Sequence, residues 1–207
     1  MSAAAVQLVL AAGRSSRMGR PKPLLDFDGR AALELVLEAG AAGGAARSVV
    51  VAPAGLEEAL SAAAARSRVP ARIIGNPDPG SEQIRSLQLA LEAIRGERHE
   101  AFFIHPADYP LATGSDYGLL LAALRSSSDG STVFIPSHAG RRGHPILCAG
   151  TLLEAFLGLP PGGTARDVIS AAKVAHVPTP NDGVLEDMDT PEEYERLLEI
   201  YRGRGKT

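Results

Sequence analysis

The sequence contains 207 residues, of which 45% are hydrophobic and 22% are charged, and its formal net charge is −3 at neutral pH. This length and apolar content suit one folded domain, and the slightly acidic balance argues against a general nucleic-acid-binding protein. The single cysteine, Cys148, excludes an internal disulfide and a cysteine-based zinc site. Because no apolar run is long enough to cross a membrane and residues 1–10 lack a basic signal segment, we expect a cytoplasmic protein with no membrane partner.

Short apolar runs alternate with amphipathic patterns along most of the chain. Apolar and β-branched runs predict strands, and apolar residues three or four positions apart predict helices. The alternation is typical of a mostly parallel sheet with helices on both faces, so we expect a single three-layer α/β/α domain over residues 1–207. The predicted strands cover residues 6–10, 48–51, 71–74, 101–104, 132–135 and 174–177. The predicted helices cover residues 31–42, 56–66, 84–94, 117–124, 151–157 and 165–173.

The pattern loosens after residue 137. The turn-rich stretch "SHAGRRGHPILCAG" allows an antiparallel strand at residues 146–148, and we expect a short acidic strand over Leu185–Asp189. A final helix opens at "TPEEY", where Thr190 is the expected N-cap, Pro191 suits the first helical turn and Glu193 completes a capping box.

The loop after the first predicted strand is rich in small and basic residues. Arg14, Arg17, Arg20 and Lys22 fall within nine residues that include no carboxylate. Open α/β sheets bind ligands beyond the carboxyl ends of their strands, and small residues let backbone N–H groups approach an anion. The loop has neither the Walker A pattern nor G-x-G-x-x-G, which argues against an NAD-dependent oxidoreductase. The sequence therefore predicts a phosphate-binding loop of another kind.

Acidic residues at two places are candidates for a magnesium site. Asp108 follows the predicted strand 101–104, so its carboxylate should lie at the same sheet edge as the basic loop. Magnesium prefers oxygen ligands and needs only one or two carboxylates besides substrate phosphates and water. Asp189 is the second candidate ligand, and Asp187, two residues earlier on the same face of the expected strand, is the alternative to it.

Five stretches together resemble the MobA-like nucleotidyltransferase family. They are "LAAGRSSRMGRPKPLL", "GSEQIRSLQLAL", "HPADYPL", "GRRGHPILC" and "EDMDTPEEY", and they occur in the family's order over nearly the whole chain. The resemblance implies a Rossmann-like, mostly parallel sheet of the nucleotide-diphospho-sugar transferase type. It also implies Mg²⁺-dependent transfer of a nucleotide to a phosphate acceptor, with release of pyrophosphate.

The resemblance and the chemistry together assign roles to individual residues. Charge that develops on the leaving pyrophosphate needs cations and N–H donors fixed beforehand, which Arg17, Lys22 and a metal on Asp108 would supply. We expect these three residues to be catalytic. By the resemblance, His144 and Arg142 lie on the acceptor side. The expected nucleotide-binding residues are Leu10, Ala11, Ala12, Gly13, Ser15, Lys22, Gly80 and Ser86.

The resemblance also suggests the substrates. The segment "LAAG" is similar to the molybdenum cofactor cytidylyltransferases (MocA-like), whereas the guanylyltransferases read Leu-Ala-Gly-Gly, a difference that falls on Ala12. We therefore expect CTP in preference to GTP, a molybdopterin-like phosphate acceptor and a molybdoenzyme partner. Tyr109 and the stretch "PPGGTARD" depart from the family pattern on the acceptor side. Three alternatives stay open: a GTP-using guanylyltransferase, a transferase for another sugar or small organic phosphate, and a non-catalytic nucleotide-binding or molybdoenzyme chaperone-like protein.

Overall fold

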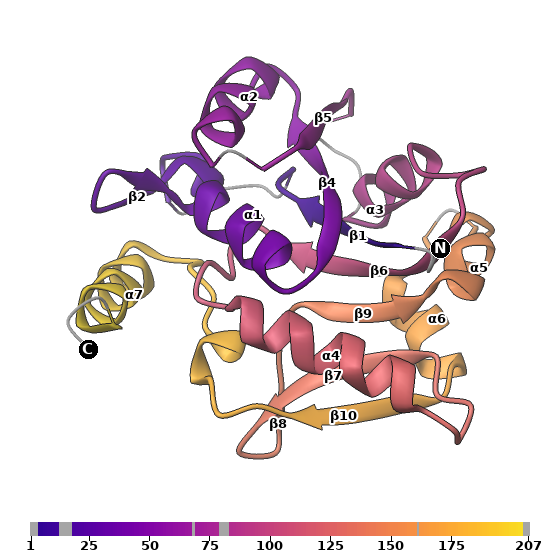
Figure 1. Ribbon diagram of the computed structural model, residues 1–207. Helices are drawn as coiled ribbons and strands as arrows, with labels where there is room; N and C mark the ends of the chain where they lie inside the picture. Colours follow the sequence, from indigo (N-terminus) through magenta and orange to yellow (C-terminus); the bar gives the residue numbers. More distant parts are fainter. Residues whose placement is uncertain (1–3, 13–17, 68, 79–82, 161, 205–207) are drawn as a thin grey trace.

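One mixed sheet runs through the molecule (Figure 1). The computed structural model describes residues 4–12, 18–67, 69–78, 83–160 and 162–204. The sheet order is β10-β7-β9-β6-β1-β4-β5, β8 pairs with β7, and β2 and β3 form a separate hairpin. The strands are β1 (Ala4–Leu10), β2 (Asp26–Phe27), β3 (Arg30–Ala31), β4 (Ala45–Pro53), β5 (Ala71–Asn76), β6 (His99–Pro106), β7 (Val133–His138), β8 (Arg141–Arg142), β9 (Ile146–Ala149) and β10 (Val174–Pro178).

Helices cover both faces of the sheet (Figure 1). Helices α3, α5 and α6 pack on one face, and α1, α2 and α4 pack on the other, so the predicted three-layer α/β/α domain is confirmed. The α-helices are α1 (Ala32–Ala42), α2 (Glu57–Arg66), α3 (Gln83–Glu92), α4 (Gly114–Ser126), α5 (Leu153–Leu157), α6 (Ala165–Ala171) and α7 (Pro191–Arg204). The 3-10 helices are η1 (Lys22–Leu24), η2 (Gly150–Leu152) and η3 (Asp182–Leu185).

Strand β1 shows why both layers form. Leu8 and Leu10 face the core cluster under α3, whereas Val9 faces the cluster under α1 and α2. Successive side chains of a strand point to opposite faces, so a continuous apolar run fills two cores at once. β1 therefore lies at the centre of the sheet, where both of its faces are covered.

The central strands bring two loops to one edge of the sheet. β1 pairs in parallel with β4 and with β6, and Leu10 lies opposite Pro106. The ladder continues one step further, because the Ala107 amide donates to the Leu10 carbonyl at 3.0 Å. Residues 11 and 12, which follow β1, and the turn that carries Asp108 thus leave the sheet side by side.

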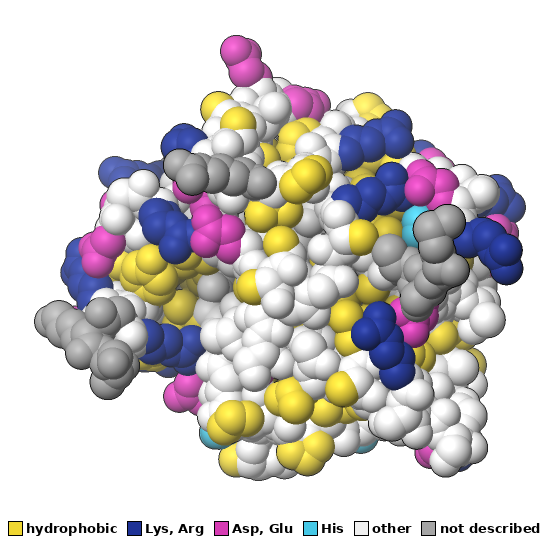
Figure 2. Space-filling model, viewed as in Figure 1, with side chains coloured by type: hydrophobic (Ala, Val, Ile, Leu, Met, Phe, Trp, Pro, Cys, Tyr) yellow, Lys and Arg dark blue, Asp and Glu magenta, His cyan; other side chains and the backbone are white. Residues whose placement is uncertain are grey.

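The C-terminal helix α7 lies beside the sheet, against the β2–β3 hairpin (Figure 1). Phe27 of the hairpin meets Tyr194 and Tyr201 of α7 edge to face, with ring centroids 5.6 Å apart in both pairs. Leu111 and Met188 belong to the same apolar cluster. Figure 2 shows hydrophobic side chains between the hairpin and α7, with Lys, Arg, Asp and Glu side chains around them. This cluster ties the hairpin to the segments that carry the candidate site.

The elements predicted up to residue 177 are present, apart from small shifts at their ends. The antiparallel strand β9 is confirmed, since it pairs with β6 and β7. The capping box of α7 is also confirmed: the Thr190 amide donates to Glu193 Oε2 at 2.8 Å, and the Glu193 amide donates to Thr190 Oγ1 at 3.3 Å. In the described part of the chain, no helix combines the length and apolar character needed to span a membrane.

The predicted strand over Leu185–Asp189 is wrong. The 3-10 helix η3 ends at Leu185, and residues 186–189 form no strand. The Met188 amide donates to the Asp108 carbonyl at 3.1 Å, while the Met188 side chain is fully buried in the cluster with α7. Packing against α7 therefore fixes this segment, whereas the sequence pattern suggested a strand that pairs with the sheet. The hairpin β2–β3, by contrast, was not predicted, because its strands of two residues each are too short to show a period.

Candidate active site

Asp108 sits in a tight turn directly after β6. The Tyr109 amide donates to the Pro106 carbonyl at 3.2 Å and closes this turn. Strand β6 is buried along residues 101–106, so the start of the turn is fixed by the core. The side chain of Asp108 is 27% exposed, and its Oδ2 accepts a hydrogen bond from Lys22 Nζ at 3.2 Å.

Lys22 lies between two carboxylates. It opens η1, whose backbone is set by the flanking Pro21 and Pro23, and the Leu24 amide donates to the Pro21 carbonyl at 3.0 Å. Its ammonium group forms ion pairs with Asp108 and with Asp189. Burial alone would lower the pKa of Lys22, but the bonds and charges of the two carboxylates raise it above its usual value. Lys22 is therefore a fixed positive charge at this sheet edge.

Asp189 and Asp187 come from the irregular segment after η3. The Asp189 amide donates to Glu193 Oε2 at 2.8 Å, which ties Asp189 to the first turn of α7. Burial, followed by the negative charges of Asp189 and Asp108, raises the pKa of Asp187. The structure thus brings all three predicted metal-site carboxylates into one electrostatic neighbourhood, and it joins Asp108 and Asp189 through Lys22.

The carboxylates fit the modest needs of a magnesium ion. Asp108 Oδ1 is buried without a hydrogen-bond partner among the described residues, and such an orphaned oxygen is costly unless a cation or donor satisfies it. No group of three or more His, Cys, Asp or Glu side chains arranged around a metal occurs in the described ranges. One or two carboxylates are enough for magnesium when substrate phosphates and water complete its shell. Asp108 and Asp189 are the residues that would hold it.

A cavity of about 460 Å³ opens beside this edge, on the α3 side of the sheet. His144 borders it, and its ring lies 4.6 Å from the ring of Tyr109. Burial lowers the pKa of His144 to about 4, so the imidazole is neutral at pH 7. The cavity is lined by Leu10, Ile84, Leu87, Ile104, Pro106, His144, Ile146, Gly162, Gly163, Thr164, Ala165 and Ile169.

Several other predicted site residues have a definite place. Leu10 lines the cavity, Ala11 packs in the core on the opposite face, and Ala12 is partly buried on the cavity side. The Ser86 hydroxyl is buried in α3 and accepts a hydrogen bond from Asn76 at 3.1 Å.

One predicted site residue lies away from the cavity, and four others are not described. Arg142 lies in the short strand β8, exposed, and is not among the residues that line the cavity. Arg17, Gly13, Ser15 and Gly80 lie outside the described residues.

A buried hydrogen-bond chain behind the Asp108 turn was missed by the sequence reasoning. His105 Nε2 lies 3.0 Å from the Tyr109 carbonyl, which can only accept, so this nitrogen donates. Burial lowers the pKa of His105 to about 3, so the ring is neutral and its Nδ1 accepts from the Tyr117 hydroxyl. Gln7 Nε2 donates to the same hydroxyl at 2.6 Å and to the Val36 carbonyl at 2.8 Å. A polar Gln7 inside the apolar strand β1 was the available signal, because a buried polar side chain needs partners.

Comparison with known proteins identifies the family. The model of the MobA-like NTP transferase domain matches residues 7–177, so the chain belongs to that family. Membership places it among the nucleotidyltransferases, as the resemblance of its motifs predicted. No protein of curated function matches the chain in sequence.

Solved structures share the fold at low sequence identity. Rv0371c from Mycobacterium tuberculosis H37Rv aligns with a TM-score of 0.77 and 22% identity over 96% of this chain and 99% of that one. A manganese complex of Rv0371c aligns with a TM-score of 0.71 and 20% identity over 95% and 98% of the two chains.

Two further structures extend this comparison. A CMP:2-keto-3-deoxy-manno-octonic acid synthetase complexed with CTP gives a TM-score of 0.74, 16% identity and coverages of 97% and 99%. Molybdopterin-guanine dinucleotide biosynthesis protein A from Archaeoglobus fulgidus gives a TM-score of 0.65, 19% identity and coverages of 94% and 97%. The predicted nucleotide-diphospho-sugar transferase type of sheet is confirmed.

Proposed function

We propose that the protein is a magnesium-dependent cytidylyltransferase that transfers CMP from CTP to the phosphate of a molybdopterin-like acceptor. The observation that carries the proposal is the placement of Lys22 between Asp108 and Asp189, beside a cavity at the carboxyl edge of β1 and β6. A cation and two carboxylates at one sheet edge suit a triphosphate and its metal. The manganese complex of Rv0371c and the CTP complex of the synthetase support the metal and the nucleotide by analogy.

The reaction needs charge stabilisation more than proton transfer. An oxygen of the acceptor phosphate attacks the α-phosphorus of the triphosphate, the bond to the bridging oxygen breaks, and pyrophosphate leaves with the electron pair. A magnesium ion held by Asp108 and Asp189 would neutralise part of the phosphate charge when bound. Lys22 carries a full charge at pH 7 and would stabilise the leaving pyrophosphate. Arg17 is proposed to act on the same group.

A general base is not required. The second ionisation of a phosphate monoester lies near pH ~6, so the acceptor oxygen is mostly dianionic at neutral pH. His144 is the one histidine among the residues that line the cavity, and it stays neutral at pH 7 because its pKa is lowered to about 4. Its position fits contact with the acceptor, and the exposed Arg142 would assist from outside the cavity.

The cavity lining favours a flat acceptor over a sugar phosphate. Most of its described side chains are apolar, among them Ile84, Ile104, Ile146 and Ile169. Each sugar hydroxyl buried there without a partner would cost about 1–3 kcal/mol. The faces of a pterin-like ring system can pack against such walls, so this lining suits the proposed molybdopterin-like acceptor. We also propose a molybdoenzyme as the final user of the product.

The choice of CTP rests on Ala12. This residue is partly buried on the cavity side directly after β1, so its methyl group takes room that a glycine would leave to a base. A purine pushed out of place would leave polar edges unpaired, a rejection on the order of 10²-fold. Gly13, Ser15, Gly80 and Ser86 are proposed to complete the nucleotide contacts, with the backbone of Leu10 and Ala11.

The test is pyrophosphate release with molybdopterin and magnesium, using CTP and GTP in turn, for the wild type and Ala12→Gly. We expect the wild type to prefer CTP and the variant to lose much of that preference. A wild-type preference for GTP would assign the protein to the guanylyltransferases. A third outcome is that neither nucleotide gives pyrophosphate with molybdopterin, but one of them does with another phosphate acceptor. That outcome would disprove the molybdopterin assignment and keep the reaction class.

A further inference from the structure

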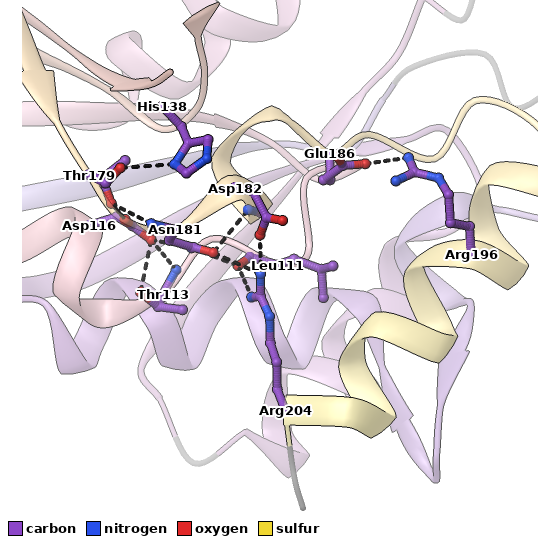
Figure 3. A network of polar contacts seen from close by, with 11 residues as sticks. Leu111, Thr113, Asp116, His138, Thr179, Asn181, Asp182, Glu186, Arg196 and Arg204 are labelled. Carbon is purple, nitrogen blue, oxygen red and sulfur yellow. Dashed lines mark hydrogen bonds and ion pairs between the residues drawn. The ribbon is translucent and has the colours of Figure 1, made fainter. Parts of the chain in front are cut away.

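A cluster of polar side chains joins the two acidic segments at a distance from the carboxylates themselves (Figure 3). We call Asp116, Asn181, Arg204 and the Leu111 carbonyl the C-terminal hub. Asn181 Nδ2 donates to the Leu111 carbonyl at 3.1 Å and to Asp116 Oδ2 at 2.7 Å, while Asn181 Oδ1 accepts from the Gly183 amide at 2.9 Å. Every polar atom of the Asn181 side chain is thus in use, and its partners come from three different segments.

Arg204 closes the hub from the last turn of α7. Its guanidinium donates to the Leu111 carbonyl at 2.9 Å, to Asn181 Oδ1 at 2.8 Å and to Asp182 Oδ1 at 3.0 Å. In Figure 3 the side chain reaches from the end of α7 into the group formed by Leu111, Asn181 and Asp182. The planar fork of an arginine directs its N–H groups at a carbonyl, an amide oxygen and a carboxylate in a fixed geometry, whereas the compact ammonium of a lysine fixes no such geometry.

The hub lies close in sequence to both candidate metal ligands. Leu111 follows Asp108 by three residues, and Gly183 precedes Asp189 by six. The two segments touch at Gly183, where an added Cβ would lie 2.5 Å from the Leu111 carbonyl oxygen. A second link from α7, the ion pair between Arg196 and Glu186, holds the same acidic segment closer to Asp187 (Figure 3). The separation of the two segments is therefore set by one backbone hydrogen bond, from the Met188 amide to the Asp108 carbonyl, and by these side-chain contacts, and not by sheet pairing.

We infer that Arg204 and Asn181 are positioning residues that hold Asp108 and Asp189 at the spacing a divalent metal needs. The inference rests on the proposed function, since it takes these two carboxylates as the metal ligands. Asn181 and Arg204 lie beyond residues 7–177, the part that matches the family model. Asp108 lies inside the matched part, whereas Asp189, the hub and α7 lie wholly or partly outside it. This chain thus uses its C-terminal helix to set the metal affinity of a site that only Asp108 shares with the matched part.

The chain offers a matched control on the same helix. Arg202 and Arg204 both belong to the last turn of α7, and both form ion pairs, Arg202 with Asp28 of the hairpin and Arg204 with Asp182. Of the two, Arg204 is the one that bonds to the Leu111 carbonyl and Asn181. Arg204→Ala and Arg202→Ala remove the same chemical group from neighbouring positions. Comparing them therefore distinguishes the effect of losing the hub from the effect of loosening α7 in general.

The experiment measures Mn²⁺ binding to the full chain by the loss of the free-ion electron paramagnetic resonance signal, together with the thermal midpoint and the Mg²⁺ dependence of turnover. For Arg204→Ala we expect roughly tenfold weaker metal binding, the usual scale for removing a group that orients a ligand, with turnover recovering at high Mg²⁺. For Arg202→Ala we expect metal binding within about twofold of the wild type, whatever its thermal midpoint, because a surface ion pair contributes little.

Arg204→Lys keeps the charge but not the fork, and we expect an intermediate loss of about threefold. This variant also tests the inference if Arg204→Ala fails to fold. Equal metal affinities in the Arg204 and Arg202 variants, with only the thermal midpoint lowered, would show that the hub is purely structural and would overturn the inference. A wild type that binds no Mn²⁺ and needs no metal for turnover would instead overturn the proposed function.

Discussion

The two segments that carry the candidate metal ligands are held in opposite ways. Asp108 follows a long buried strand, and the backbone of its turn bonds to the sheet and to His105. Asp189 follows residues 186–188, which form no regular structure. One backbone bond joins its segment to the Asp108 carbonyl, and the other contacts that hold it are made by side chains, among them those of Glu193, Arg196 and Arg204. The first arrangement is less sensitive to single side-chain substitutions, because backbone hydrogen bonds hold most of it. The second depends on a few side chains, so it is where metal affinity can be tuned.

The largest effect is expected at Asp108, in the rigid segment. Asp108→Asn keeps the shape of the side chain and removes the charge that would hold the metal and Lys22. We expect metal-dependent pyrophosphate release to fall by on the order of 10³-fold, with little change in the thermal midpoint. Steady-state kinetics at rising Mg²⁺ checks this. Turnover close to wild type at saturating Mg²⁺ would show that Asp108 is not a ligand.

Lys22 stands between the two segments and comes next in size. Lys22→Met removes the ammonium that joins Asp108 and Asp189, and we expect turnover to fall roughly 10² to 10³-fold with a smaller change in KM for the nucleotide. Lys22→Arg should recover only part of the rate, because a planar fork differs from a compact point charge. Equal losses in kcat and in nucleotide affinity would mean that Lys22 only attracts the triphosphate.

The irregular segment after η3 offers a direct comparison of its two carboxylates. Asp189→Asn should lower turnover roughly 30-fold, since Asp189 shares Lys22 with Asp108, whereas Asp187→Asn should change it less than about threefold. The raised pKa of Asp187 means that its ionised form costs the fold stability above its unfolded pKa of ~3.9. Thermal melts of Asp187→Asn should therefore show a higher midpoint than the wild type at pH 7 and no gain at pH 3. If Asp187→Asn lowered turnover more than Asp189→Asn did, Asp187 would be the metal ligand.

A smaller effect than at Asp189 is expected behind the turn of Asp108, at His105. His105→Leu removes the donor to the Tyr109 carbonyl and should lower kcat about tenfold, whereas His105→Gln keeps a donor near that position and should lose little. Tyr117→Phe is the control, because it breaks the same buried chain without touching the Tyr109 carbonyl. Equal falls in kcat for Tyr117→Phe and His105→Leu, in step with their thermal midpoints, would mean that His105 acts on stability alone.

Sequence patterns were sufficient for the sheet and for one half of the site. Strand β6 and the position of Asp108 follow from an apolar run and a turn signal, which act locally. The geometry around Asp189 was predicted wrongly as a strand, because a short run of acidic and apolar residues also fits an irregular segment with Met188 buried against α7. The hub could not be predicted, since Asn181 and Arg204 reach Leu111 across 70 and 93 residues of sequence. Side-chain contacts over such distances leave no periodic signal.

The ion pairs of Lys22 also bear on how the protein behaves before any substrate arrives. Two carboxylates kept near each other repel, yet the ammonium between Asp108 and Asp189 serves as their resident counter-ion. Among the described residues, Lys22 therefore holds the two carboxylates together in the absence of a metal. On the proposed function, a divalent cation would take over part of this pairing. Adding Mg²⁺ should accordingly raise the thermal midpoint of the wild type only slightly and that of Lys22→Met distinctly more.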